Sequence, residues 1–285
     1  MTDPQLATQW FSFPAFDPVA ISIGPLAIRW YALSYMVGLL GGWQILRQLA
    51  KRADSPLSVL QLDGLLNWVL FGTIIGGRLG YVFFYKPADY LSDPLSIFYI
   101  WQGGMAFHGG FLGVVLAVFL YARRHKIPVL PLGDYVALVA PLGLLCGRLA
   151  NFINGELFGR VTSHPIGMVF PNGGPLPRHP SQLYEAGLEG LVLGCVMIIA
   201  WRIGLPKRYP GIGIALFLTG YGLARFIAEF TRQPDHFLGL YDVAGILSIS
   251  HGQLLSLPMI LAGLWLGAAV IKQNNAPAAA SHDKK

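Results

Sequence analysis

Seven long apolar stretches separated by short polar loops constrain the fold of this chain more than any other feature of its sequence. They span roughly residues 20–46, 64–85, 104–121, 132–153, 182–202, 211–231 and 252–271. A helix needs roughly 20 mainly apolar residues to cross a bilayer, and each stretch is close to that length. The sequence therefore predicts an all-α, polytopic membrane protein with about seven transmembrane helices.

The composition supports a membrane protein and argues against a nucleic-acid binder. Of 285 residues, 54% are hydrophobic and only 12% are charged, whereas a soluble domain is typically about 25% charged. The net charge of +6 comes from basic residues in short loops, where they mark membrane orientation. No basic stripe interleaved with aromatic residues is present, as nucleic-acid binding would require.

The distribution of Lys and Arg predicts the orientation. Twelve of the 20 basic residues lie in one set of loops and in the C-terminal tail, four lie in the other loops, and four lie within the apolar stretches. By the positive-inside rule the N-terminus is outside (periplasmic) and the C-terminus is cytoplasmic. We expect one transmembrane domain over 1–272, a turn-rich outer cap over about 154–180, and a disordered cytoplasmic tail over 273–285. The N-terminus lacks a basic region before an apolar core, so no cleavable signal peptide is expected.

Charged residues inside the expected helices all fall on one side of the membrane. An arginine at the bilayer centre costs roughly 2.5–3.5 kcal/mol on insertion scales, so each one needs an explanation. In the predicted topology Arg29, Arg78, Arg148 and Arg225 lie in the outer half, as does His108. This pattern predicts a polar chamber that opens to the outer leaflet. Arginines with few carboxylates nearby suit a phosphate, which a guanidinium can bind through two parallel hydrogen bonds.

Each arginine also has a purely structural interpretation. Arg78 is equally compatible with pairing to a carbonyl or carboxylate between helices, and Arg29 with snorkelling at the interface. Arg225 and Glu229 are four residues apart on one helix face, together with Tyr221, so they could form an ion pair that only packs the bundle.

The other polar candidates are open to the same two interpretations. Asn151, Asn154 and Glu156 could merely complete the end of a helix. A lone histidine in an apolar region is usually a core residue, but four glycines flank His108 and would let a ligand come close. No His or Cys pair has metal-ligand spacing, and both cysteines lie in apolar runs, so no metal and no cofactor is expected.

Several segments together resemble the prolipoprotein diacylglyceryl transferase family over nearly the whole chain. The two most distinctive segments are Gly-Gly-Met-Ala-Phe-His-Gly-Gly and Gly-Arg-Leu-Ala-Asn-Phe-Ile-Asn-Gly-Glu. The matching segments are 16–18, 22–25 with 29–31, 76–81, 103–110, 147–156, 178–185, 221–226 and 229–235.

The resemblance implies a reaction in bacterial lipoprotein biosynthesis, at the bacterial inner membrane. The diacylglyceryl group of phosphatidylglycerol would move to the lipobox cysteine thiol of a preprolipoprotein, and glycerol 1-phosphate would leave. The nucleophile belongs to the substrate, so no catalytic Ser or Cys is needed. We expect Arg148 and Arg225 to bind the phosphate and His108 to take the thiol proton, with water or Glu156 as alternative bases. The expected substrate-binding residues are Tyr31, Arg78, Asn151, Asn154, Glu156, Tyr221, Glu229 and Arg232.

Two other functions remain compatible with the residues alone. A transporter or channel for an anionic solute would also have several spans and buried cations, but no cation marks a path through the inner half. A non-catalytic lipid-binding or assembly protein is disfavoured by the combination of His108 with clustered Asn and Glu side chains.

Overall fold

The computed structural model describes residues 11–14, 16–24, 26–52, 55, 57–233, 240–243 and 247–275. The chain forms two compact units, the first made of Met1–Gly42 with Val136–Lys285 and the second of Trp43–Tyr135. Helices α1 (Trp30–Ala50) and α5 (Val129–Ile153) contribute to both units.

The second unit is built on the close packing of two helices, α2 (Val59–Phe84) and α4 (Phe107–Arg124). Glycines line their contact: a Cβ atom at Gly72 would lie 2.6 Å from the Gly113 carbonyl oxygen, and one at Gly80 would lie 2.7 Å from Gly109 Cα. Small residues let membrane helices approach backbone to backbone. Short elements join the two helices: α3 (Pro87–Ser92), η2 (Pro94–Phe98) and η3 (Ile100–Gln102).

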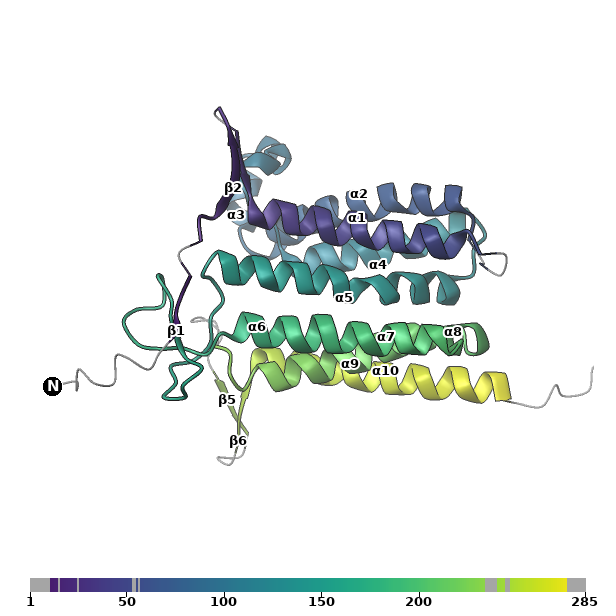
Figure 1. Ribbon diagram of the computed structural model, residues 1–285. Coiled ribbons are helices and arrows are strands. Elements are labelled where there is room, and N and C mark those ends of the chain that lie inside the picture. Colours follow the sequence, from purple (N-terminus) through teal and green to yellow (C-terminus); the bar gives the residue numbers. More distant parts are fainter. Residues whose placement is uncertain are drawn as a thin grey trace, which may run out of the picture. The chain divides into compact units, whose positions relative to one another are not determined.

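The first unit contains the remaining helices. The helical run of α6 (Ser181–Glu185), the π-helical η4 (Ala186–Val192) and α7 (Leu193–Arg202) is continuous. After the short α8 (Leu205–Arg208), helices α9 (Ile212–Ala228) and α10 (His251–Asn275) pack along each other (Figure 1). Their contact is close, because a Cβ at Gly222 would lie 2.7 Å from Ile260 Cγ1. Strands β5 (Leu240–Val243) and β6 (Leu247–Ser250) pair antiparallel just before α10.

A segment with little regular secondary structure follows α5 in the first unit. Strand β1 (Phe11–Ser12) pairs in parallel with β4 (Met168–Val169), and the rings of Phe13, Phe152 and Phe170 pack together beneath them. Arg178 secures the loop, because its guanidinium donates to the Gly173 carbonyl at 2.7 Å and stacks over Phe158. The expected turn-rich segment 154–180 is therefore an ordered structure at the end of α5.

The all-α membrane architecture is confirmed. Four helical segments are long and apolar enough to cross a membrane, namely Val59–Phe84, Val129–Ile153, Ser181–Arg202 and His251–Asn275. The apolar helix Ile212–Ala228 is shorter, and α1 and α4 occupy the remaining two predicted positions. The count of seven spans stays a prediction.

Three predicted boundaries are wrong, for identifiable reasons. Residues 20–24 and 26–29 are not helical, because β2 (Val19–Ile23) and β3 (Leu26–Arg29) form an antiparallel hairpin in which Gly24 adopts φ 58°, a conformation that glycine tolerates. Helix α4 begins at residue 107, not 104, because Gly103 and Gly104 have positive φ. Helix α10 continues to Asn275, past the expected span end at 271 and into the expected tail; the rest of that tail, 276–285, lies outside the described residues.

Candidate functional site

A cluster of buried arginines and glutamates forms where α5, α6 and η4 meet in the first unit. Arg148 lies near the end of α5 and bridges two carboxylates: its Nη1 is 2.7 Å from Glu185 Oε2, and its Nε donates to Glu189 Oε2 at 3.0 Å. Glu185 ends α6, and Glu189 lies in the π-helical turn. Such π-helical turns occur frequently at functional sites.

Two further arginines join the same cluster from α9 and the segment after it. Arg225 Nη1 lies 3.2 Å from Glu185 Oε1, and Arg225 Nη2 contacts Glu229. Arg232 Nη1 lies 3.1 Å from the same Glu185 oxygen. Glu185 thus pairs with all three arginines. Glu229 is fixed from its other side by Ser250, whose hydroxyl donates to Oε2 at 2.7 Å.

Burial differs systematically between the two kinds of side chain in the cluster. The three glutamate side chains are at most 4% exposed, whereas Arg148, Arg225 and Arg232 keep 11–17% of their side-chain surface. Within the described part of the chain, no side-chain or backbone acceptor lies within hydrogen-bonding distance of Arg148 Nη2, Arg225 Nε or Arg232 Nη2. An anion can therefore reach the exposed sides of guanidinium groups whose buried sides are held by carboxylates.

This arrangement corrects one premise of the sequence analysis, which took the arginines to have few carboxylates nearby. Three guanidinium groups face three carboxylates, so the cluster is neutral when all six are ionised. Glu185 and Glu189 were not predicted as site residues. The available signal was two acidic residues four positions apart at the start of an apolar span, where charge is expensive.

A second polar network lies beside the first and is organised around Glu156. Its Oε1 accepts from Asn151 Nδ2 at 2.9 Å and from Asn154 Nδ2 at 3.3 Å. Its backbone carbonyl accepts from Gln182 Nε2 at 2.6 Å. Asn151 follows Arg148 by one helical turn, and Gln182 precedes Glu185 by one turn, so the two networks share both helices. Gln182, fully buried, was not predicted.

Two predicted tyrosines belong to the same unit. The Tyr221 hydroxyl interacts electrostatically with Arg148, Arg225 and Glu189. Tyr31 is linked to the cluster indirectly. Its hydroxyl lies 3.1 Å from the Tyr35 hydroxyl, and Tyr35 interacts electrostatically with Arg148 and Glu156.

Arg78 belongs to the second unit and is held by backbone oxygens. Its guanidinium donates to the carbonyls of Ser96, Ile97 and Gly103 at 2.6–2.8 Å and to Gly104 at 3.1 Å, and it is 5% exposed. This arrangement favours the carbonyl-pairing interpretation over a substrate-binding role, because four donor contacts are already used. The arginine clamps the segment between α3 and α4.

The remaining predicted residues are less defined. His108 is the second residue of α4, in the second unit, and its side chain lies outside the described residues. Arg29 is exposed at the end of β3, outside the helix in which the sequence analysis expected it. No group of three or more His, Cys, Asp or Glu side chains among the described residues could hold a metal ion.

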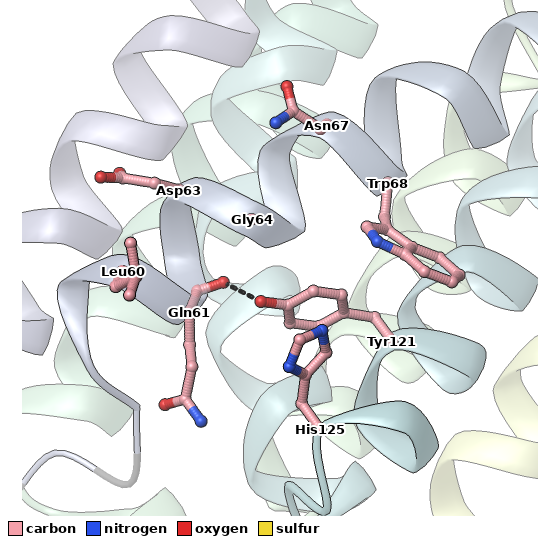
Figure 2. Close-up of a pocket in the computed structure, with 8 residues that line it drawn as sticks. All are labelled: Leu60, Gln61, Asp63, Gly64, Asn67, Trp68, Tyr121 and His125. Carbon is pink, nitrogen blue, oxygen red and sulfur yellow. Dashed lines mark hydrogen bonds between the residues drawn. The ribbon is translucent and has the colours of Figure 1, made fainter.

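A pocket of about 520 Å³ in the second unit contains none of the predicted site residues. Figure 2 shows it between the first turns of α2 and the last turn of α4, where the Tyr121 hydroxyl donates to the Gln61 carbonyl at 2.6 Å. Trp68 and His125 form part of its wall. The charged cluster and this pocket are thus separate features of the chain.

Apolar helices long enough to cross a membrane, together with a buried cluster of paired arginines and glutamates, define a membrane protein with a polar site. Comparison with known proteins gives the family. The family model described as prolipoprotein diacylglyceryl transferase matches residues 18–269. The chain belongs to this family.

Curated relatives carry the same name. A phosphatidylglycerol–prolipoprotein diacylglyceryl transferase of Rhodospirillum rubrum is 58% identical over 88% of this chain and 91% of its own length. Proteins of the same name from Rhodopseudomonas palustris and Nitrobacter winogradskyi are 50% and 51% identical, over 95% and 89% of this chain and 96% and 88% of their own lengths.

Proposed function

We propose that this protein transfers the diacylglyceryl group of phosphatidylglycerol to the lipobox cysteine of preprolipoproteins. The substrate thiolate attacks the lipid glycerol carbon that carries the phosphate, a C–S bond forms, and the C–O bond to phosphate breaks. The bonding electrons leave with the phosphate oxygen, so glycerol 1-phosphate is released. The thiol proton goes first to a base and then to solvent or to the departing phosphate.

The observation that carries the proposal is the partial exposure of three arginines anchored on one buried carboxylate. A lipid phosphodiester has one negative charge, and the departing phosphate monoester gains a second. Donors that are fixed before the reaction stabilise developing charge without reorganising. Glu185 and its neighbours hold the guanidinium groups of Arg148 and Arg225 in fixed orientations, which is the preorganisation that this step needs.

The glutamates also limit what the cluster can bind. A bare group of three guanidinium ions would hold any anion tightly, including the product. With three carboxylates behind them, the arginines offer directed N–H groups rather than a net charge of +3. In this proposal the phosphate binds by the geometry of those donors, and product release is not opposed by a large uncompensated charge.

His108 remains our candidate base for the thiol. The thiolate is the reactive form of cysteine, and an unperturbed imidazole titrates near neutral pH. Glu156 is the alternative, although two asparagine amides already donate to its Oε1.

The proposal includes a location. The protein lies in the bacterial inner membrane, with the N-terminus periplasmic and the C-terminus cytoplasmic. The end of α5 that carries the cap then faces the periplasm, where the lipobox cysteine of an exported precursor would arrive.

The test uses purified protein in detergent with phosphatidylglycerol and a lipobox peptide. Mass spectrometry of the peptide should show the mass of one diacylglyceryl group on its cysteine with the wild type. The adduct should be absent with Arg148→Ala and present with Arg123→Ala, a matched control at an exposed position of α4 whose guanidinium stacks over Phe119. Absence of the adduct from folded wild type would reject the proposal, and anion flux into vesicles would then test a transporter.

A further inference from the structure

The buried oxygens beside the arginine cluster carry an inference about how the lipid headgroup is recognised. Among the described residues, five buried side-chain polar atoms lack a hydrogen-bond partner, and four of them are acceptor oxygens of this region. One of the four, Glu185 Oε2, is compensated by its ion pair with Arg148. The others are Asn154 Oδ1, Gln182 Oε1 and Glu189 Oε1.

The orientation of two of these acceptors is fixed by Glu156. The amide nitrogen of Asn154 donates to the Glu156 carboxylate, and the amide nitrogen of Gln182 donates to the Glu156 backbone carbonyl. Because both nitrogens face acceptors, neither amide can turn around without losing its hydrogen bond. The two side-chain carbonyl oxygens are therefore left as acceptors that require a donor.

A buried acceptor without a donor lowers the stability of the folded protein. A site that keeps two such acceptors is therefore suited to a ligand with hydroxyl groups. Gln182 lies one helical turn before Glu185, and Asn154 lies just past the end of α5, which carries Arg148. Gln182 is therefore about one turn, roughly 5 Å, from Glu185. Asn154 is six residues from Arg148, but its amide nitrogen donates to the same Glu156 oxygen as Asn151, which follows Arg148 by one turn. A three-carbon polyol attached to a phosphate bound by Arg148 is long enough to reach these side chains.

We infer that Gln182 and Asn154 select the headgroup of the lipid by accepting hydrogen bonds from its glycerol hydroxyls. This inference rests on the proposed function, because the phosphate of the same lipid is bound by Arg148. Phosphatidylglycerol has two free headgroup hydroxyls and satisfies both oxygens. Gln182 is thus a specificity-determining residue, and Asn154 shares that role.

The test compares two lipids of equal headgroup charge, of which only one carries these hydroxyls. Phosphatidylethanol has the same phosphodiester charge and can carry the same acyl chains, but its headgroup has no hydroxyl. Diacylglyceryl transfer to a lipobox peptide is measured by mass spectrometry with each lipid. For the wild type, kcat/KM should be about tenfold or more higher with phosphatidylglycerol, since each unpaired acceptor costs on the order of a factor of ten.

Gln182→Met removes the acceptor while keeping the side-chain volume similar. Its preference for phosphatidylglycerol should fall to about threefold or less, and transfer from phosphatidylethanol should stay within about threefold of wild type. The retained activity on phosphatidylethanol shows that the variant is folded. Gln48→Met, at an exposed position of α1, should keep the full preference. Asn154→Ala provides a second variant that should also lower the preference.

Three results would overturn the inference or its basis in distinguishable ways. Equal transfer from both lipids by the wild type would refute headgroup selection and leave the transferase intact. An equal loss with both lipids in Gln182→Met and Asn154→Ala would show that these residues only support the fold. No transfer from either lipid by folded wild type would instead reject the proposed function.

Discussion

Replacing Arg148 with lysine separates the charge of this residue from its geometry. The guanidinium makes two contacts, 2.7 Å to Glu185 and 3.0 Å to Glu189, and its Nη2 has no acceptor among the described residues. A lysine retains the positive charge, so neither buried carboxylate loses its counter-ion entirely. Its single ammonium group cannot hold both carboxylates and also present a planar pair of donors to a phosphate.

The size of the effect follows from these contacts. Loss of one charge-assisted hydrogen bond should lower the free energy of unfolding by about 1.5–3 kcal/mol. Loss of a preorganised donor to the departing phosphate should raise the activation barrier by about 2.7–4 kcal/mol, which slows turnover about 100- to 1000-fold. Activity should therefore fall far more than stability.

The assay measures initial rates of peptide diacylglyceryl transfer and thermal unfolding on the same detergent preparation. Arg123→Lys, on the exposed surface of α4, is the matched control and should keep wild-type values for both. Turnover of Arg148→Lys within about threefold of wild type would refute the role assigned to the paired donors.

Four further results are expected. Glu185→Gln should destabilise the protein more than Glu189→Gln in thermal unfolding, because Glu185 pairs with three arginines and Glu189 with one; the reverse order would contradict the cluster. His108→Gln should abolish transfer at neutral pH without a change in thermal stability; full activity would assign the proton to water or Glu156. Burial and nearby His164 lower the pKa of His179, so the folded state binds this proton less tightly than the unfolded state. The free energy of unfolding should therefore decline as the pH falls below about 6.5, the pKa of a free histidine. That decline, followed by melting temperature from pH 8 to pH 5, should be smaller in His179→Gln. Gly80→Val should lower the melting temperature strongly, because an added Cβ would lie 2.7 Å from Gly109 Cα. A Cβ at Gly204 would have no atom within 4 Å. Gly204→Ala should therefore lower the melting temperature only through the strain of its positive φ.

The lengths of the apolar stretches predicted the positions of the helices well, because a helix that crosses a membrane must be apolar over that length. It failed where a backbone conformation rather than hydropathy decides the boundary. Residues 19–29 are as apolar as a helix, but Gly24 turns them into a hairpin. Gly103 and Gly104, both with positive φ, delay the start of α4 in the same way.

The arginines and asparagines of the site were predicted because charge inside an apolar stretch is conspicuous. Their arrangement was not, because it depends on which helices are neighbours. Glu185 and Glu189 acquire their role only when α6 and η4 pack beside α5 and α9. Gln182 and the unpaired oxygens beside Glu156 have no local signal at all, since hydrogen-bond satisfaction is a property of the folded chain.

The central claim is that this protein moves a diacylglyceryl group and releases the phosphate headgroup in the same event. The most direct measurement uses phosphatidylglycerol labelled separately in its diacylglycerol part and in its headgroup, with a lipobox peptide as acceptor. The account predicts that the first label appears on the peptide cysteine and the second in free glycerol phosphate, in equal amounts, with wild type but not with Arg148→Ala. Headgroup label on the peptide, or release of glycerol phosphate without peptide modification, would contradict it.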